Sequence, residues 1–205
     1  MSSPRTETEV KIYVPALDAL RDKLENSSAK LVQERVYERN VRYDLEDGSL
    51  TSRGVVLRLR EDVGVTLTYK EPGIIERGII TREEIEVELS DFDAMQSILG
   101  KLGYNESMVY EKYRTTYHCH GAEIMLDELP YGTFIEVEGA TEDIEFVLSE
   151  FGLTDEERRG DSYAKLFDYV KHHLELTFKD LTFKNFEGID VPESAFIPPG
   201  SIVIR

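Results

Sequence analysis

Residues 7–14, Glu-Thr-Glu-Val-Lys-Ile-Tyr-Val, alternate between charged or polar side chains and apolar ones. A period of two places Glu7, Glu9 and Lys11 on one face of a β-strand and apolar residues on the other. Those apolar residues are Val10, Ile12 and Val14. Pro15 follows directly and ends the strand. This stretch decides the fold, because the same arrangement recurs through most of the chain.

Seven further segments have the character of strands, and most follow one another directly. They are residues 31–45, 55–61, 65–71, 78–90, 108–120, 122–128 and 133–139. Short turns such as Asp62-Val63-Gly64 join several of them, which is typical of antiparallel hairpins. Helical spacing of apolar residues predicts helices near 16–30, 91–102, 142–151 and 162–174. The sequence therefore predicts an α+β fold with eight antiparallel strands.

The ionisable side chains on these strands are sorted by sign. Acidic pairs stand two residues apart at Glu7/Glu9, Glu84/Glu86 and Glu136/Glu138, and basic pairs stand at Arg58/Arg60 and Lys112/Arg114. A solvated sheet face is the ordinary explanation for any single strand. For the whole set, like charges on one face repel unless each pair holds an opposite charge. Helices over the apolar face and closure of the sheet predict an eight-stranded antiparallel β-tunnel, a closed barrel with a charged interior and helices packed outside.

Such a lining suits a polyphosphate bound together with a divalent cation. Arginine and lysine bind phosphate oxygens, and paired carboxylates hold Mg²⁺ or Mn²⁺. The sequence contains no GxxxxGK[ST] motif, which excludes a P-loop nucleotide-binding protein.

Composition limits the partners. Across 205 residues, 24 Lys and Arg stand against 41 Asp and Glu, which gives a net charge of −17. This charge argues against nucleic-acid and membrane partners, because phosphate-rich surfaces are held by a basic face. A single cysteine, Cys119, and a start without a signal-peptide pattern favour a cytoplasmic protein. We expect a monomer or a homodimer.

Several ordered motifs resemble one known family. Glu7-x-Glu9-x-Lys11 is similar to the ExExK signature of the CYTH superfamily, the triphosphate tunnel metalloenzymes. The resemblance continues from about residue 5 to 172 through further blocks in the same order. These blocks are Leu57–Arg60, Leu67–Lys70, Arg82–Glu86, Tyr110–Arg114, Leu126–Gly132, Phe134–Gly139 and Ser162-Tyr163. Glu38-Arg39-Asn40 is similar to the cyclase-like branch of the family.

The resemblance implies roles for individual residues. The metal ligands would be Glu7, Glu9, Asp127, Glu136 and Glu138. The phosphate-binding residues would be Lys11, Arg58, Arg60, Lys70, Arg82, Lys112 and Arg114. The catalytic group would be Glu9, Lys11, Lys70 and Glu86, with Glu84 and Glu86 orienting the cations or binding a second metal. The cofactor would be Mg²⁺ or Mn²⁺.

Residues 1–174 are predicted to form the tunnel domain, and residues 175–205 a C-terminal extension outside the resemblance. Asp155–Arg159 is expected to form a solvated helical turn.

The function expected first is metal-dependent cleavage of a phosphoanhydride bond in inorganic tripolyphosphate or in a nucleoside or thiamine triphosphate. A class IV adenylate cyclase, which makes cyclic AMP and pyrophosphate from ATP, would use the same lining. A module that binds polyphosphate or nucleotide without turnover is the third possibility.

Overall fold

The computed structural model describes residues 5–153 and 158–199, in which ten strands and five α-helices are assigned. The strands are β1 (Arg5–Tyr13), β2 (Lys30–Asp44), β3 (Val56–Glu61), β4 (Val65–Lys70), β5 (Ile74–Glu76), β6 (Ile79–Leu89), β7 (Asn105–Cys119), β8 (Ala122–Leu129), β9 (Gly132–Glu138) and β10 (Arg158–Arg159). The helices are α1 (Leu17–Glu25), α2 (Ser49–Ser52), α3 (Phe92–Lys101), α4 (Thr141–Phe151) and α5 (Tyr163–Leu174), with two 3₁₀ turns after α5, η2 (Lys184–Phe186) and η3 (Glu193–Phe196). None of the described helices is long and apolar enough to cross a membrane.

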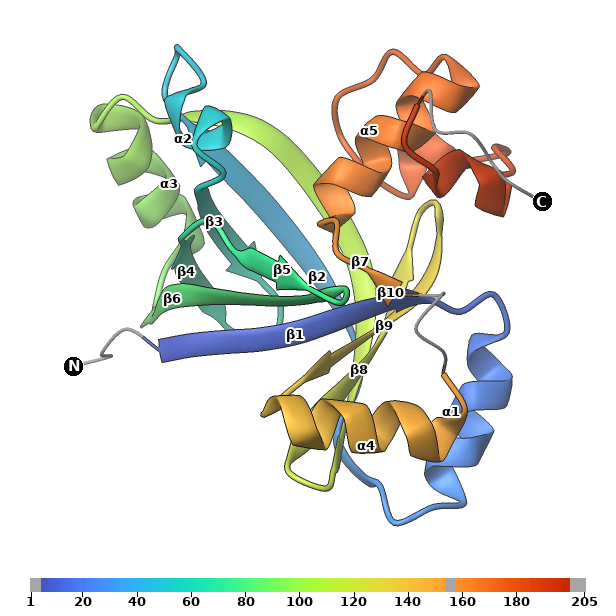
Figure 1. Cartoon of the computed structure of the whole chain (residues 1–205). Coiled ribbons are helices and arrows are strands. Elements are labelled where there is room, and N and C mark those ends of the chain that lie inside the picture. The colour runs from blue at the N-terminus through green and yellow to red at the C-terminus, as the bar shows by residue number, and fades with distance from the viewer. Residues whose placement is uncertain (1–4, 154–157, 200–205) are drawn as a thin grey trace.

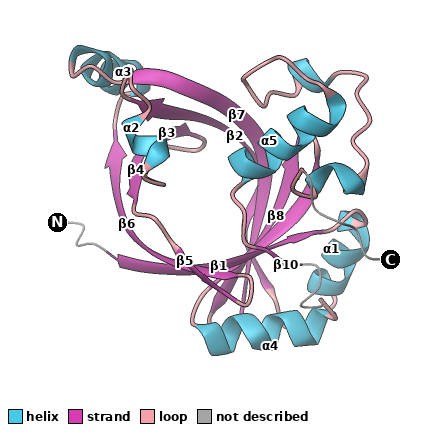
Figure 2. Cartoon of the chain, turned by 45° about the horizontal axis from the view of Figure 1, so that its top comes forward, coloured by secondary structure: helices cyan, strands magenta, loops and turns pink. Residues whose placement is uncertain are grey.

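Eight of the strands close into a ring, as Figures 1 and 2 show. Each pairs antiparallel with its neighbour in the order β1-β9-β8-β7-β2-β3-β4-β6, and β6 pairs back to β1. Closure joins Arg5–Val10 of β1 to Ile79–Glu84 of β6, while Glu9–Tyr13 of β1 pairs with β9. β1 therefore pairs with both β6 and β9, and its pairing with β6 closes the barrel. The prediction of a closed eight-stranded antiparallel barrel is confirmed.

Three short elements were not predicted. β5 pairs with Ile79–Thr81 of β6, β10 pairs with Lys11-Ile12 of β1, and α2 lies between β2 and β3. The helical turn predicted for residues 155–159 is wrong at its end, since Arg158 and Arg159 form β10. Residues 155–157 lie outside the described residues.

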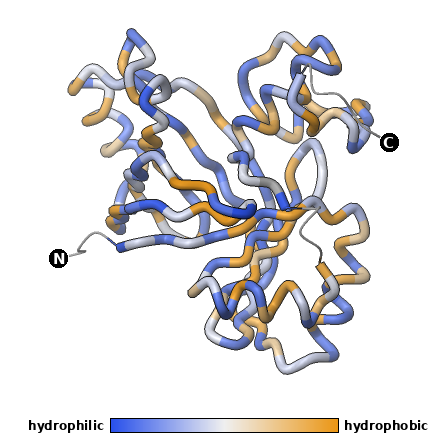
Figure 3. The backbone as a smooth tube through the Cα atoms, viewed as in Figure 1, coloured by the Kyte–Doolittle hydropathy of each residue, from blue (hydrophilic) through white to orange (hydrophobic). Residues whose placement is uncertain are grey.

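The apolar core forms three clusters, two outside the barrel and one at its end. The alternation of hydrophilic and hydrophobic residues that produces this arrangement can be followed along the strands in Figure 3. The first cluster packs the outer faces of β1, β8 and β9 against α1 and α4, through fully buried residues such as Ile12, Val137 and Ile144. A smaller cluster packs β2 and β3 against α3. Helices thus cover the apolar faces of these strands, as predicted, and the opposite faces line the tunnel.

The third cluster fills one end of the barrel. Tyr13, Leu129 and Phe134 continue the inward-facing positions of β1, β8 and β9, and they pack against α5 and the residues after it. Leu181 and Phe196 of the C-terminal extension are almost fully buried in this cluster. Residues 175–199 therefore share a core with the barrel and α5.

Candidate active site

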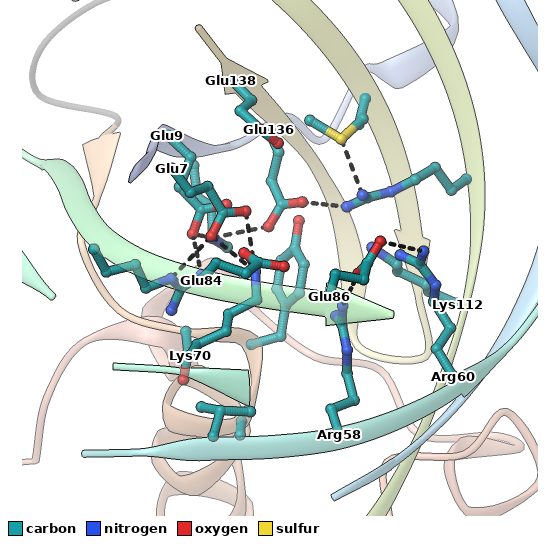
Figure 4. A pocket seen from close by; sticks show the side chains of 18 of the residues that line it. Glu7, Glu9, Arg58, Arg60, Lys70, Glu84, Glu86, Lys112, Glu136 and Glu138 are labelled. Carbon is teal, nitrogen blue, oxygen red and sulfur yellow. Dashed lines mark hydrogen bonds and ion pairs between the residues drawn. The ribbon is translucent and has the colours of Figure 1, made fainter. Parts of the chain in front are cut away.

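The inward faces of the strands line a pocket of about 260 Å³ (Figure 4). Apart from Asp127, every residue predicted for the site lies in its lining. Six barrel strands supply them, because side chains two apart on a strand fall on the same face. The lining is composed largely of charged side chains, and most of them form ion pairs with one another.

The first group of ion pairs joins β1 to β4 and β6. The Lys70 ammonium lies 2.9 Å from a Glu7 carboxylate oxygen and 2.8 Å from Glu84. The Arg82 guanidinium donates to Glu7 at 3.1 Å and to Glu9 at 2.8 Å. Lys70 and Arg82, expected to bind phosphate, are thus held by carboxylates when no ligand is bound.

Lys11 bridges this group to β9. Its ammonium lies 2.7 Å from Glu9 and 2.8 Å from Glu136, and all three side chains are less than 10 % exposed. Burial would lower the pKa of Lys11, but the two carboxylates raise it above its usual value. Burial would raise the pKa of Glu136, yet Lys11 and Arg114 hold it well below its usual range. Both groups are therefore charged at neutral pH.

Two carboxyl groups of the lining lie close to other carboxylates, and their pKa values are raised. Burial and the neighbouring Glu7 raise the pKa of Glu84 to about 7. Burial together with the charges of Glu7 and Glu9 raises the pKa of Glu138 to about 7, although Arg5 opposes the shift from 3.1 Å. Carboxylates crowded in this way ionise more readily when a cation comes between them.

Asp127 lies behind the lining and is fully buried. Its two oxygens accept hydrogen bonds from Arg114, at 2.6 Å to Oδ1 and 2.5 Å to Oδ2. Oδ2 also accepts from Lys112 at 3.0 Å and from the Tyr163 hydroxyl at 2.8 Å. With both oxygens engaged by cations, Asp127 is better placed to orient Arg114 and Lys112 than to bind a metal.

Arg58 on β3 is held more loosely by carboxylates, whereas its neighbour Arg60 lies 3.1 Å from an oxygen of Asp62. Each lies 3.9 Å from an oxygen of Glu86, whose side chain is 36 % exposed. Arg58 donates instead to two neutral groups, the hydroxyls of Tyr110 and Thr68, both at 3.2 Å. Arg58 is therefore a cation that an incoming phosphate can engage without first displacing a close ion pair.

Several lining residues were not assigned a site role from the sequence. Arg5, Arg42, Tyr110, Glu123 and Met125 all contribute to the pocket. Arg5 lies one step along β1 from Glu7, and Met125 and Glu123 lie one and two steps along β8 from Asp127, so extending the period of two would have found them. Tyr110 likewise shares the inward period of Lys112 and Arg114 on β7, and Arg42 shares that of Glu38 and Asn40 on β2.

The segment Glu38-Arg39-Asn40 is divided between the two faces of β2. Glu38 and Asn40 are buried, at 2 % and 0 % exposure, whereas Arg39 stacks over Phe92 of α3 on the outside. Burial would raise the pKa of Glu38, but Lys112 and Arg114, at 3.4 and 3.7 Å, lower it to about 2. Glu38 is thus a second carboxylate that holds the cations of β7.

The carboxylates at the β1 end of the tunnel are donors of the type that a divalent cation prefers. Glu7, Glu9 and Glu138 face the same space, since Glu9 and Glu138 are directly paired across β1 and β9. Their mutual repulsion, visible in the pKa of Glu138, is the electrostatic condition that a bound cation relieves. Carboxylate oxygens without soft ligands favour Mg²⁺ or Mn²⁺.

Comparison with known proteins agrees with this geometry. The family model for the CYTH domain matches residues 5–158. The chain belongs to the CYTH domain family. A provisionally named adenylate cyclase of Methanocaldococcus jannaschii is 29 % identical over 140 residues, which are 67 % of this chain and 79 % of that protein.

Solved structures of CYTH-like proteins have the same fold. A protein of Pyrococcus horikoshii superposes with a TM-score of 0.68 at 29 % identity, covering 78 % of this chain and 97 % of that one. A Vibrio parahaemolyticus protein, provisionally described as an adenylate cyclase, gives a TM-score of 0.72 at 23 % identity, covering 80 % and 98 %. A Hippeastrum protein named as an adenylyl cyclase and described as having a dominant triphosphatase activity gives 0.61 at 21 %, covering 80 % and 94 %. The last two likenesses concern the fold alone.

Proposed function

We propose that this CYTH protein cleaves a phosphoanhydride bond of a triphosphate bound in its tunnel, with a divalent cation. The observation that supports this most is that acidic and basic side chains of the lining are concentrated on different strands. Carboxylates gather at β1 and β9, whereas Arg58, Arg60, Lys112 and Arg114 stand on β3 and β7. A polyanion with an attached cation is complementary to both halves, while a simple anion has no use for so many carboxylates.

In the proposed mechanism, Arg58 receives a non-bridging phosphate oxygen first, since no carboxylate holds it closely, and Arg60 binds a further oxygen. Lys112 and Arg114 neutralise further oxygens while Glu38 and Asp127 keep them in position. Lys11, Lys70 and Arg82 exchange part of their contact with carboxylates for contact with the substrate. Cations held in place before the reaction stabilise charge on the phosphoryl group as the bond breaks.

The cation would be held by Glu7, Glu9 and Glu138, with Glu136 at the edge of the group. When bound, Mg²⁺ or Mn²⁺ supplies charge neutralisation at the phosphate and lowers the pKa of a coordinated water. Glu86 faces Arg58 and Arg60 and accepts a hydrogen bond from Thr68 at 2.8 Å, so its proposed role is to orient the two arginines.

Adenylate cyclase activity is the second candidate, and the name of the Methanocaldococcus relative favours it. The lining favours hydrolysis, because the pocket offers a purine few apolar surfaces. Within the described part of the chain, its uncharged members are Val56, Tyr110, Met125, Ser162, Tyr163 and Ala164.

Phosphorus NMR of the products decides between the candidates. The protein is incubated with tripolyphosphate and, separately, with ATP, each with Mg²⁺, with Mn²⁺ or with EDTA. Orthophosphate that forms only with the metal supports a triphosphatase. Cyclic nucleotide with pyrophosphate supports the cyclase. No turnover, with thermal stabilisation by either ligand, would contradict an enzyme and favour a binding module.

A further inference from the structure

β7 is longer than the neighbour that covers one of its edges. β2 pairs with β7 from Asn105 to His118, but β8 pairs only from Tyr113 to Cys119. The first half of β7 therefore presents backbone groups that β8 does not reach. An uncovered strand edge inside a fold must find other partners for these groups.

The C-terminal extension supplies those partners. Leu181 forms a parallel bridge beside Tyr110, since its amide donates to the carbonyl of Val109 and its carbonyl accepts from Glu111, both at 2.9 Å. The Asp180 carboxylate accepts from the amide of Val109 at 2.9 Å. Three consecutive edge groups of β7 are thus satisfied by two residues of the extension.

Further contacts hold this segment on the strand. The Phe183 amide donates to the Glu111 carboxylate at 2.9 Å, and the Asn185 side chain donates to the Asp180 carbonyl at 2.9 Å. Leu181 is fully buried. We call residues 179–186 the β7 clamp.

The clamp binds the backbone on both sides of Tyr110. Its neighbours Val109 and Glu111 carry the backbone bonds to the clamp, and its own side chain lines the tunnel. The ring packs against the cluster formed by α5 and the extension, and the hydroxyl accepts a hydrogen bond from Arg58 at 3.2 Å. Burial would raise the pKa of Tyr110, but Arg58 and Lys112 bring it below its usual value.

We propose that the β7 clamp is a positioning element for substrate binding: it fixes Tyr110, and Tyr110 fixes Arg58 in the orientation that receives a phosphate oxygen. The binding part of this proposal rests on the proposed function. The clamp lies beyond the residues that the CYTH family model matches, so this control of Arg58 comes from outside the matched part of the chain.

Asp180 permits a sharp test in the full-length chain. Asp180→Ala removes the acceptor for the Val109 amide, whereas Asp180→Asn retains an oxygen at the same place. Tripolyphosphate binding is measured by calorimetry in EDTA. We expect Asp180→Ala and Tyr110→Phe each to weaken binding about tenfold, as for the loss of one hydrogen bond to a charged group, and Asp180→Asn to restore it.

The double variant and a control exclude a general loss of stability. If the clamp acts through Tyr110, Asp180→Ala with Tyr110→Phe binds no more weakly than Tyr110→Phe alone. Phe196→Ala removes a buried ring of the same cluster that packs on Tyr13, Tyr131 and Phe134, and it should lower the melting temperature without weakening binding. Fully additive losses, or equal loss in Phe196→Ala, would overturn the proposal.

A second readout does not depend on the function. Carbon NMR of tyrosine labelled at Cζ gives the pKa of Tyr110, assigned with Tyr110→Phe. We expect a value below that of free tyrosine in the wild type and in Asp180→Asn, and a rise in Asp180→Ala. An unchanged pKa in Asp180→Ala would overturn the proposal. A rise without any binding of tripolyphosphate by the wild type would contradict the proposed function instead.

Discussion

At the scale of single residues, Glu9 links the proposed metal site to the phosphate-binding residues. One of its oxygens accepts hydrogen bonds from both Lys11 and Arg82. Glu9→Gln keeps the shape but removes the negative charge that a cation needs. We expect the activity of the variant to lose its response to Mg²⁺ and Mn²⁺, measured as rate against metal concentration. Glu83→Gln, on an exposed residue of β6, is the matched control. A metal response equal to that of the wild type would contradict the assignment of Glu9.

Substitution of Arg58 is expected to change substrate binding and not the response to metal. Arg58→Ala removes a cation that carboxylates hold only at 3.9 Å, so the folded structure loses little and the substrate loses a partner. We expect KM to rise by roughly tenfold or more while the metal response is retained, because hydrogen bonds to charged groups contribute about 1.5–3 kcal/mol. Steady-state kinetics with tripolyphosphate test this, and an unchanged KM would remove Arg58 from the binding site.

Glu38 allows a prediction about pH. Its pKa is lowered to about 2 in the folded protein, against 4.5 for an ordinary glutamate. The stabilising contribution of its charge is therefore complete above about pH 4.5 and is lost as the pH falls toward 2. Glu38→Gln should be less stable than the wild type by on the order of 3 kcal/mol at pH 7, since one pKa unit corresponds to about 1.4 kcal/mol.

This difference should shrink as the pH is lowered through that window. Urea unfolding of both proteins from pH 7 to pH 2.5 measures it. A difference that is constant with pH would show that the substitution disturbs packing and not an ion pair.

The sequence predicted which residues face the tunnel better than what each one contacts. The period of two is a local property, so the inward positions of Glu7, Glu9, Arg58 and Glu136 follow from the chain itself. The burial of Asp127 behind Arg114, and the contact of Glu38 with Lys112, arise from pairing between distant strands. A single sequence does not specify the register of such strand pairs, so these contacts could not be predicted from it.

At the scale of elements, β1 determines whether the barrel closes. Its inner face carries the charged residues, and its outer face places Ile12 at 0 % exposure against the helices. Ile12→Ala should destabilise the fold by about 3 kcal/mol, as for other large-to-small substitutions in a core, without changing KM below the melting temperature. Thermal unfolding and kinetics measure both effects.

Val63→Ala, at a position 81 % exposed, should change neither stability nor KM. A raised KM in Ile12→Ala well below its melting temperature would show that the outer core also shapes the tunnel.

The long elements were predictable and the short ones were not. The ends of the eight barrel strands agree with the prediction to within a few residues, because each is long enough for its period to be evident. β5 contains two exposed isoleucines in succession, so it shows no alternation. β10 has only two residues and forms because it pairs with the edge of β1. The local sequence contains no signal for that pairing.

At the scale of the whole molecule, the extension and the barrel share one cluster, through Leu181 and Phe196 on one side and Phe134 on the other. We therefore expect a single cooperative unfolding transition, with the same midpoint by far-ultraviolet and near-ultraviolet circular dichroism. Amide exchange at Leu181 should be as slow as in β9. An earlier, separate melting of residues 175–199 would contradict a shared core and would favour the predicted boundary at residue 174.

The position of the apolar core has a consequence for evolution. Most soluble barrels of this size are stabilised by what fills them, so a new ligand site must be created at the expense of packing. Here the three clusters that stabilise the chain lie outside or at one end of the barrel, and the middle is held by ion pairs whose members can be exchanged in complementary sets. Exchanges of complementary sets of charges in the lining can therefore accumulate without disturbing these clusters. One scaffold can then acquire different substrates by drift within the tunnel, with its outer layers unchanged.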